Sequence, residues 1–424
     1  MRYVVPVIAI ASVLIGCGSH AAESVEEISV SDAEAIASAA AIEVTPTDWP
    51  WWRGASRDNR ADSAVPPLEW GETENVVWKV AVPGEGHASP AVWGSCVLVT
   101  SAEEADQTQT LFCYDRASGD LKWQREIHQG GFMKKKPENT YASATCACDG
   151  ERVYCAFLHD RGLWVTAVDL EGNIVWQREA GPFTSQHGYG SSPVLFKSLV
   201  IVSGDNPGSS FLAALDCASG EVKWRVRRPN KPCYSTPVVA HVAGRDQLLL
   251  SGHSAVTSYD PATGELLWKS EGPADVIANT AAWLDDLVFT SGGYPQNGIM
   301  AIRADGSGEV VWSNQIKAYV PSPLVVGERL LIVQDDGIAH CFDARTGNEA
   351  WKQRLGGSFY ASPTLSGQYV FVPNKEGTMF VFRCGDKFVA VAENDMQEGC
   401  TASPVICGGR LYQRTSGHLV CIGK

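Results

Sequence analysis

The feature that most constrains the fold of this chain is a motif that returns about every 40 to 50 residues. Each copy begins with small residues around a Ser or Thr, usually followed by Pro. Eight such starts occur, at residues 87–90, 141–144, 191–193, 234–237, 279–281, 321–323, 360–363 and 401–404. A fixed period of this length indicates a repeat architecture, so the repeat unit decides the fold.

One unit, residues 191–226, contains four short apolar runs separated by turn residues. These runs predict four antiparallel strands and no helix. Asp216 is expected to bond the backbone amides of the last turn, and Gly220 to supply a positive φ there. A unit of four antiparallel strands is the blade of a β-propeller.

Most units end in a Trp, which presents a large apolar face for docking against the neighbouring blade. The tryptophans in this position are Trp78, Trp123, Trp176, Trp224, Trp268, Trp312 and Trp351. The strand that ends near Trp78 precedes the first start, whereas the last start is followed by only three strands. We therefore predict an all-β, eight-bladed propeller that the N-terminal strand closes by completing the C-terminal blade.

Composition and charge restrict the class of partner. A hydrophobic content of 45% and a charged content of 19% are typical of a well-packed globular protein. The formal net charge of −14 argues against nucleic acid as a partner, because binding phosphates requires a basic surface. We expect a monomer.

The N-terminus reads as a targeting segment. An apolar run follows Arg2, is too short to span a bilayer, and ends at Leu14-Ile15-Gly16-Cys17. This end resembles the lipobox of bacterial lipoproteins. The resemblance implies a signal peptide over 1–16, lipidation of Cys17, and an outer-membrane lipoprotein that faces the periplasm. Residues 17–47 are rich in Ala, Glu and Ser and predict a flexible or partly helical tether. The propeller is expected over 48–424.

The repeat of Asp, Gly and Trp at fixed spacing resembles the pyrroloquinoline-quinone (PQQ) repeat superfamily of eight-bladed propellers. That superfamily includes quinoprotein dehydrogenases, which hold PQQ and Ca²⁺ on the axis, and the BamB-type lipoprotein, a scaffold of the outer-membrane assembly machinery. Residues 49–54, 75–79, 187–193 and 292–295 look more like a group of uncharacterised, mostly planctomycete, PQQ-like repeat proteins.

Enzymatic chemistry has little support in the sequence. The resemblance to quinoprotein dehydrogenases implies adjacent cysteines over the quinone, and no Cys-Cys pair occurs. Neither a catalytic motif nor a typical zinc spacing is found; Cys146, Cys148, Cys155 and His159 do not have such a spacing. We predict no catalytic residue, no metal site and no cofactor, with PQQ and Ca²⁺ as the alternative.

Aromatic residues gather where each blade begins, at the expected mouth of the axial channel. Such a ring could bind a peptide strand, a sugar or a planar ligand, or it could only plug the channel by packing. The candidate binding residues are His87, Tyr141, His187, Tyr189, Tyr234, Tyr319 and Tyr360.

Two further expectations concern packing. Trp51, Trp52 and Arg53 should pack across one face of the propeller, with Arg53 stacking or pairing. The candidate disulfides in an exported chain are Cys146–Cys155 and Cys400–Cys407.

The function that these observations favour is a non-catalytic, BamB-like binding scaffold at the bacterial cell envelope. Its expected partners are envelope proteins or peptides, and its expected contact with the membrane is the lipid anchor. The alternatives are a PQQ-dependent dehydrogenase and a carbohydrate- or polymer-binding propeller.

Overall fold

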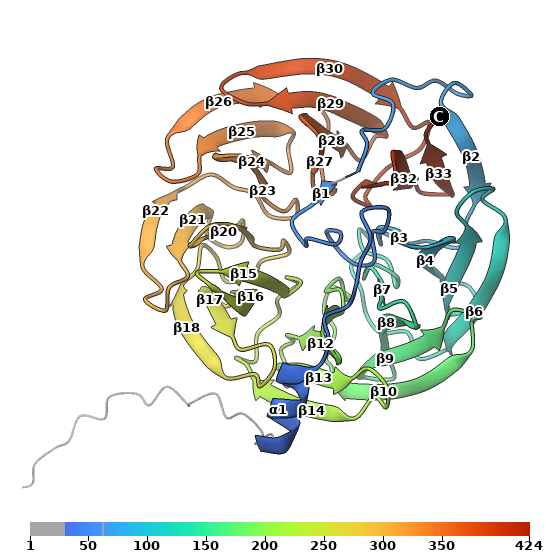
Figure 1. The fold of residues 1–424 in the computed structure, drawn as a ribbon, viewed down its shortest axis with the longest axis vertical. Helices are drawn as coiled ribbons and strands as arrows, with labels where there is room; N and C mark the ends of the chain where they lie inside the picture. Colours follow the sequence, from blue (N-terminus) through green and yellow to red (C-terminus); the bar gives the residue numbers. More distant parts are fainter. Residues whose placement is uncertain (1–29, 62) are drawn as a thin grey trace, which may run out of the picture.

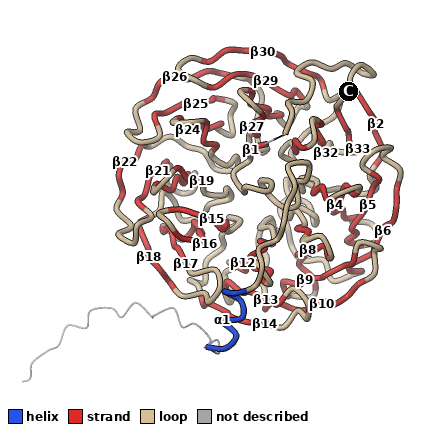
Figure 2. The backbone as a smooth tube through the Cα atoms, viewed as in Figure 1, coloured by secondary structure: helices blue, strands red, loops and turns tan. Residues whose placement is uncertain are grey.

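Eight sheets, seven with four strands and one with a fifth strand added, are arranged in a ring about a central axis, as the computed structural model of residues 30–61 and 63–424 shows (Figure 1). The predicted eight-bladed propeller is therefore confirmed. Outside the strands the described chain is mostly turns and loops, which connect each blade to the next (Figure 2). No helix among the described residues is long and apolar enough to cross a membrane.

Blades are numbered along the chain from the first complete one. Blade 1 consists of β3 (Ala91–Trp93), β4 (Cys96–Glu103), β5 (Thr108–Asp115) and β6 (Leu121–Gln129). Blade 2 consists of β7 (Ala147–Cys148), β8 (Arg152–His159), β9 (Gly162–Asp169) and β10 (Ile174–Pro182), and blade 3 of β11 (Val194–Phe196), β12 (Leu199–Gly204), β13 (Phe211–Asp216) and β14 (Val222–Arg227). Blade 4 consists of β15 (Val238–Val242), β16 (Arg245–Gly252), β17 (Ala255–Tyr259) and β18 (Leu266–Glu271).

Blades 5 to 8 complete the ring. Blade 5 consists of β19 (Ala282–Leu284), β20 (Leu287–Gly292), β21 (Gly298–Arg303) and β22 (Val310–Asn314). Blade 6 consists of β23 (Leu324–Val326), β24 (Arg329–Val333), β25 (Ile338–Asp343) and β26 (Glu349–Arg354), and blade 7 of β27 (Thr364–Ser366), β28 (Tyr369–Pro373), β29 (Thr378–Cys384) and β30 (Phe388–Asp395). Blade 8 consists of β31 (Val405–Cys407), β32 (Arg410–Arg414), β33 (His418–Ile422) and β2 (Val76–Ala81).

The ring closes through the N-terminal strand. Strand β2 pairs antiparallel with β33, so that Trp78 lies opposite Cys421 and Val80 opposite Leu419. This pairing is the predicted closure of the ring, and it gives blade 8 its fourth strand.

The second strand of each blade is buried on both faces, because each sheet packs between two others. Strand β12 is buried along its whole length, whereas the outer strand β14 alternates between buried and exposed residues. The core is therefore divided among the seams between blades. Leu324, Leu331 and Cys341 of blade 6, for example, pack with Val370 and Phe382 of blade 7.

The turn between the last two strands has the predicted chemistry. The Asp216 carboxylate accepts hydrogen bonds from the backbone N–H groups of Ala218 and Ser219, at 3.1 and 2.8 Å. Gly220 has a φ of +72°, and a Cβ added there would lie 2.6 Å from the Trp176 ring of the preceding blade. Gly is thus required both for its backbone conformation and for close approach of the indole.

The part of the expected tether that is described lies against the propeller. Helix α1 (Val30–Ser38) buries Ile36 among residues of blades 3 and 4, and the Lys197 ammonium donates to the carbonyl of Ala37. Ile42 and Val44 then pack against the seam between blades 2 and 3. The expected signal peptide and Cys17 lie outside the described residues, so the lipid anchor stays a prediction.

Candidate functional site

A funnel with a volume of about 850 Å³ opens on the propeller axis. All eight blades contribute to its wall, each through the connector that leads from the last strand of one blade to the first strand of the next. Equivalent wall positions, one from each connector, are occupied by His87, Ser143, Gly190, Tyr234, Ala278, Val320, Tyr360 and Thr401.

Two residues further along, a ring of hydroxyl side chains joins the blades at the base of the funnel. Its members are Ser89, Thr145, Ser192, Thr236, Thr280, Ser322, Ser362 and Ser403. At six seams the backbone N–H of one ring residue donates to the hydroxyl oxygen of the next, at 2.8 to 3.0 Å. At the other two, the hydroxyls of Ser235 and Ser89 donate to carbonyls of the adjoining blade. The Ser or Thr of the repeat is therefore an interblade connector.

The N-terminal segment 49–61 closes the far end of the funnel. Its path runs across the centre of the ring (Figure 1). The Trp52 indole N–H donates to the Thr280 hydroxyl at 2.9 Å, which places this side chain at the funnel base. Strand β1 (Arg60–Ala61) then pairs in parallel with β27. The funnel is blind because this segment covers the axis.

Arg53 is the central residue of this closure, with 1% of its surface exposed. Its guanidinium donates to the carbonyls of Thr280 at 3.1 Å and Pro323 at 3.0 Å, so that it bridges blades 5 and 6. Burial lowers the pKa of Arg53 to about 10, which leaves the side chain charged at neutral pH. The pairing expected for Arg53 is thus with carbonyl groups.

Aromatic side chains line the upper wall. The Tyr234 hydroxyl and His187 Nδ1 are 2.9 Å apart, and their rings stack with centroids at 5.6 Å. The Lys375 ammonium lies 4.1 Å from the centre of the Tyr360 ring. Burial raises the pKa of Tyr319 to about 12. Tyr294 lines the same wall, and 62% of its surface is exposed.

The mouth is electropositive, although the chain as a whole carries a net charge of −14. The pKa of His87 is lowered to about 4 by burial and then by Lys375, Arg414 and Lys135. The pKa of His187 is likewise lowered by burial and then by Lys136 and Lys134. Both imidazoles are therefore neutral at pH 7, and cations from separate blades converge around them.

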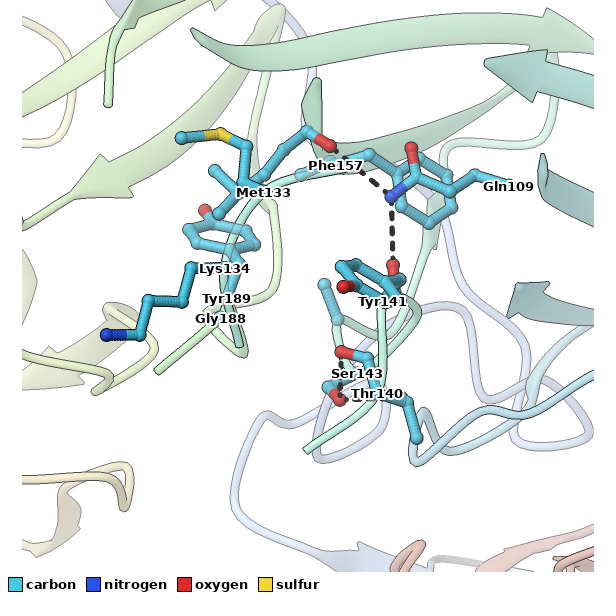
Figure 3. Close-up of a pocket in the computed structure, with 12 residues that line it drawn as sticks. Gln109, Met133, Lys134, Thr140, Tyr141, Ser143, Phe157, Gly188 and Tyr189 are labelled. Carbon is cyan, nitrogen blue, oxygen red and sulfur yellow. Dashed lines mark hydrogen bonds between the residues drawn. The ribbon is translucent and has the colours of Figure 1, made fainter. Parts of the chain in front are cut away.

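Tyr141 and Tyr189 lie outside the funnel, so the sequence-based placement of these two residues at the mouth was wrong. They line a separate cavity of about 10 Å³ together with Gln109 and Met133 (Figure 3). For Tyr141 the reason is register: the hydroxyl ring contains Thr145, so the start of blade 2 lies two residues later than the start predicted at 141–144. Tyr189 directly precedes the wall position Gly190, and its hydroxyl donates to the Ser203 carbonyl at 3.1 Å within the seam between blades 2 and 3. Tyr141 stacks on Phe132 instead, with ring centroids 3.9 Å apart.

His87, His187, Tyr234, Tyr319 and Tyr360 all line the funnel, and whether they bind a ligand stays a prediction. Sequence reasoning missed Lys136, Lys317 and Tyr294 on its wall. The alignment of Thr145-Cys146 with the Ser-Pro steps was the signal that could have corrected the register.

The repeat tryptophans lie at the seams. For five of them the indole N–H donates to a backbone carbonyl of the next blade, at 2.8 to 3.2 Å; these are Trp78, Trp123, Trp176, Trp312 and Trp351. Trp268 donates to Gln247 of its own blade, and Gln247 reaches the Ala304 carbonyl in blade 5. The Trp224 indole N–H is buried and has no hydrogen-bond partner among the described residues.

The disulfides expected from the sequence are not formed. All twelve cysteines of the described residues are free and buried. Cys146 and Cys155 pack in the seam between blades 1 and 2, while Cys400 and Cys407 belong to different seams. Burial raises the pKa of Cys400 to about 12, as expected for a thiol in the core.

The comparison with protein families decides the relationship. The model of the family described as outer membrane protein assembly factor BamB matches residues 69–188, 189–353 and 296–387. The chain belongs to this family. Among curated BamB proteins, the one from Legionella pneumophila is 24% identical over 205 residues, which are 45% of this chain and about half (49%) of that protein. The one from Shewanella oneidensis is 23% identical over 340 residues, which are 75% of this chain and 81% of that protein.

Solved structures share the fold of this BamB-family chain. BamB from Moraxella catarrhalis matches with a TM-score of 0.61 and 15% identity, over 82% of this chain and 97% of that one. The quinohemoprotein alcohol dehydrogenase from Comamonas testosteroni matches with a TM-score of 0.67 and 13% identity, over 93% and 83%. At these identities the likeness concerns the fold, which scaffolds and oxidoreductases share.

The second structure raises the question of whether the funnel fits PQQ with Ca²⁺. Ca²⁺ takes six to eight oxygen ligands, usually with several carboxylates among them. Glu138 is the one carboxylate among the described residues that line the funnel, and it is solvent-exposed. The residues present do not fit such a metal site.

Proposed function

We propose that this chain is a non-catalytic binding scaffold at the bacterial cell envelope and that it takes part in outer-membrane protein assembly. Membership of the BamB family supports the role, because the relatives carry the name of assembly factors. In this proposal the lipid anchor on Cys17 holds the propeller at the outer membrane. The partners are envelope proteins, and no reaction is catalysed.

The blind axial funnel is the observation that carries the proposal. Its volume of about 850 Å³ lies in the range of sites that enclose a ligand, and it is preformed by eight rigid blades. Tyr234, Tyr319 and Tyr360 offer flat apolar faces with polar tips, and the largely exposed Tyr294 adds a fourth at the rim. Such side chains hold an extended peptide by contact with its backbone and side chains. We therefore assign an extended segment of a partner protein to the funnel.

The test is complementation in the source organism. Deletion of the gene is expected to reduce the fraction of folded outer-membrane proteins, measured by their heat-modifiable mobility in gels. The wild-type gene should restore this fraction, and the variant Tyr234→Ala/Tyr319→Ala should not. A matched control is Leu121→Ala on the outer strand of blade 1, where 50% of the side chain is exposed far from the axis. Full restoration by the double variant would refute the role of the funnel.

A photo-crosslinking experiment identifies the partner directly. A photoreactive amino acid at Tyr294 in whole cells is expected to yield crosslinks to an envelope protein, and the same residue at Leu121 should not. If purified protein instead binds PQQ with Ca²⁺ in a saturable way by calorimetry, the scaffold proposal fails in favour of a quinoprotein.

A further inference from the structure

The hydroxyl ring leaves a set of unused donors at the funnel base. A Ser or Thr hydroxyl carries one proton and two lone pairs. At seven ring positions the oxygen accepts a hydrogen bond, yet within the described residues none of these O–H groups has an acceptor. The same seven residues line the funnel, each with 5% or less of its surface exposed: Thr145, Ser192, Thr236, Thr280, Ser322, Ser362 and Ser403.

A permanent cation lies beneath these donors. Arg53 is buried and hydrogen-bonded to carbonyl oxygens of Asp58, Thr280, Ala281 and Pro323, and no carboxylate among the described residues accepts from it. Carbonyl groups solvate the guanidinium without cancelling its charge. The guanidinium therefore contributes a positive potential at the funnel base, which the nearby Asp58 carboxylate reduces in part.

The funnel wall above the base also carries positively charged side chains. Lys136 and Lys317 line it, and neither forms an ion pair among the described residues. The aliphatic part of Lys317 packs over Gly293, where an added Cβ would lie 3.2 Å from its Cγ, so this lysine is held at the wall. Glu138 is the one carboxylate among the described residues that line the funnel, and it is exposed to solvent. The Asp335 carboxylate lies behind the wall, where it accepts from the backbone N–H groups of Tyr319 and Val320.

We propose that the base of the funnel binds the C-terminal carboxylate of an extended peptide. An extended chain that enters a blind funnel end-on must stop at its base, and the anionic group at the end of a peptide chain is its C-terminal carboxylate. Its two oxygens would accept the unused O–H donors, as carboxylates do in other sites that capture chain termini. An N-terminal ammonium would be repelled by the positive charges of Arg53, Lys136 and Lys317. This inference rests on the proposed function and names the part of the partner that the funnel recognises.

The experiment compares two randomised hexapeptide libraries that differ only at the C-terminus, which is a free carboxylate in one and an amide in the other. Immobilised full-length protein should retain the carboxylate library, and fluorescence anisotropy of retained peptides should show binding about tenfold or more tighter than that of their amides.

Variants of the protein locate the effect. Lys136→Gln/Lys317→Gln should weaken carboxylate binding several-fold more than amide binding, whereas Lys352→Gln on the outer strand β26 should change neither. Thr236→Val removes one O–H donor at the base and should weaken binding. Thr236→Ser keeps the hydroxyl and should bind like the wild type. Because Thr236→Val also removes the acceptor of the Ser192 N–H, its melting temperature is measured as well, and the loss of binding counts only if the variant is still folded at the assay temperature.

Each remaining outcome decides against the inference. Equal retention of both libraries overturns the carboxylate subsite and leaves the funnel as a peptide site. Retention of neither library overturns the subsite as well, and the assembly phenotype then decides separately on the proposed function. If free acetate or PQQ binds in a way that depends on Lys136 and Lys317 while peptides do not, the site takes small carboxylates and the inference about a peptide terminus is overturned.

Discussion

Replacement of Arg228 tests whether a buried ion pair holds the funnel wall. Arg228 and Asp205 each have 1% of the side chain exposed, and the guanidinium donates to both carboxylate oxygens at 2.8 and 3.1 Å. Arg228 also donates to the Tyr259 hydroxyl at 2.9 Å. It begins the connector that carries Tyr234 into the funnel. Arg228→Met would leave the Asp205 carboxylate buried, with His253 Nε2 at 3.5 Å as the one basic nitrogen within 4 Å among the described residues.

The magnitude follows from the cost of an unpaired buried charge. Removal of one partner of a buried pair costs about 3–5 kcal/mol. For a cooperative unit of about 375 residues the entropy of unfolding is about 0.8 kcal/mol/K, so the expected fall in melting temperature is about 4–6 °C. Asp205→Asn should have a similar effect. The double variant should lose about 1–3 kcal/mol less than the sum, because the two residues share one interaction.

Differential scanning calorimetry measures these shifts. The matched control is Arg303→Met, because Arg303 pairs with Asp286 at 2.6 Å but both side chains are more than a third exposed (34% and 38%). That variant should change the melting temperature by about 1 °C or less. Strictly additive single effects, or a shift for Arg228→Met as small as the control, would show that the buried pair does not stabilise the wall.

Three further predictions follow from packing and burial. Gly220→Ala should lower the melting temperature more than Gly94→Ala, because both positions have a positive φ but only at Gly220 would the new Cβ meet a ring; the reverse order would refute this reasoning. Burial, and then the neighbouring His159, lower the pKa of His128 to about 4. Between pH 6.5 and pH 4 the His128 imidazole is therefore protonated in the unfolded chain but neutral in the folded one. As the pH falls through this range, the free energy of unfolding should fall by at most about 3 kcal/mol. In urea titrations His128→Phe should remove this part of the acid sensitivity, and the exposed His241→Gln should not. Alkylation followed by mass spectrometry should modify few of the twelve buried thiols in native protein and all twelve after denaturation, whereas disulfides would leave pairs unmodified.

The fold could be predicted because the same physical requirement recurs around the ring. A Trp that must bury its ring, a Gly that accepts that ring and an Asp that fixes the turn give most blades their own sequence signal. The closure of the ring was equally predictable, because the three strands at the C-terminal end of the chain and the one strand before the first repeat start complete a single blade. Every contact between distant residues that the predicted fold requires is specified by the repeat itself.

The closure of the funnel could not be predicted in the same way. Arg53 binds carbonyls of residues 227 or more positions away, and backbone carbonyls have no signature in a sequence. A positive charge beside Trp51 and Trp52 indicated that the segment packs somewhere, but it did not indicate that the segment crosses the axis. The expected disulfide between Cys400 and Cys407 failed for a related reason, because sequence spacing does not show which buried thiols share a seam.

The register of blade 2 shows how finely the site depends on alignment. Tyr141-Ala142-Ser143 resembles Tyr360-Ala361-Ser362, yet the interblade hydrogen bonds are made by Thr145. A Tyr at the wall position must stand two residues before the ring hydroxyl, as Tyr234 and Tyr360 do. The hydroxyl ring is a stronger criterion than the aromatic residue, because six of its eight hydroxyls accept from a backbone N–H of the adjoining blade, whereas an aromatic ring can pack in many places. In other propellers with this repeat, the residue two positions before each ring Ser or Thr should therefore identify the funnel wall, and the chemistry of the ligand should be inferred from those eight residues.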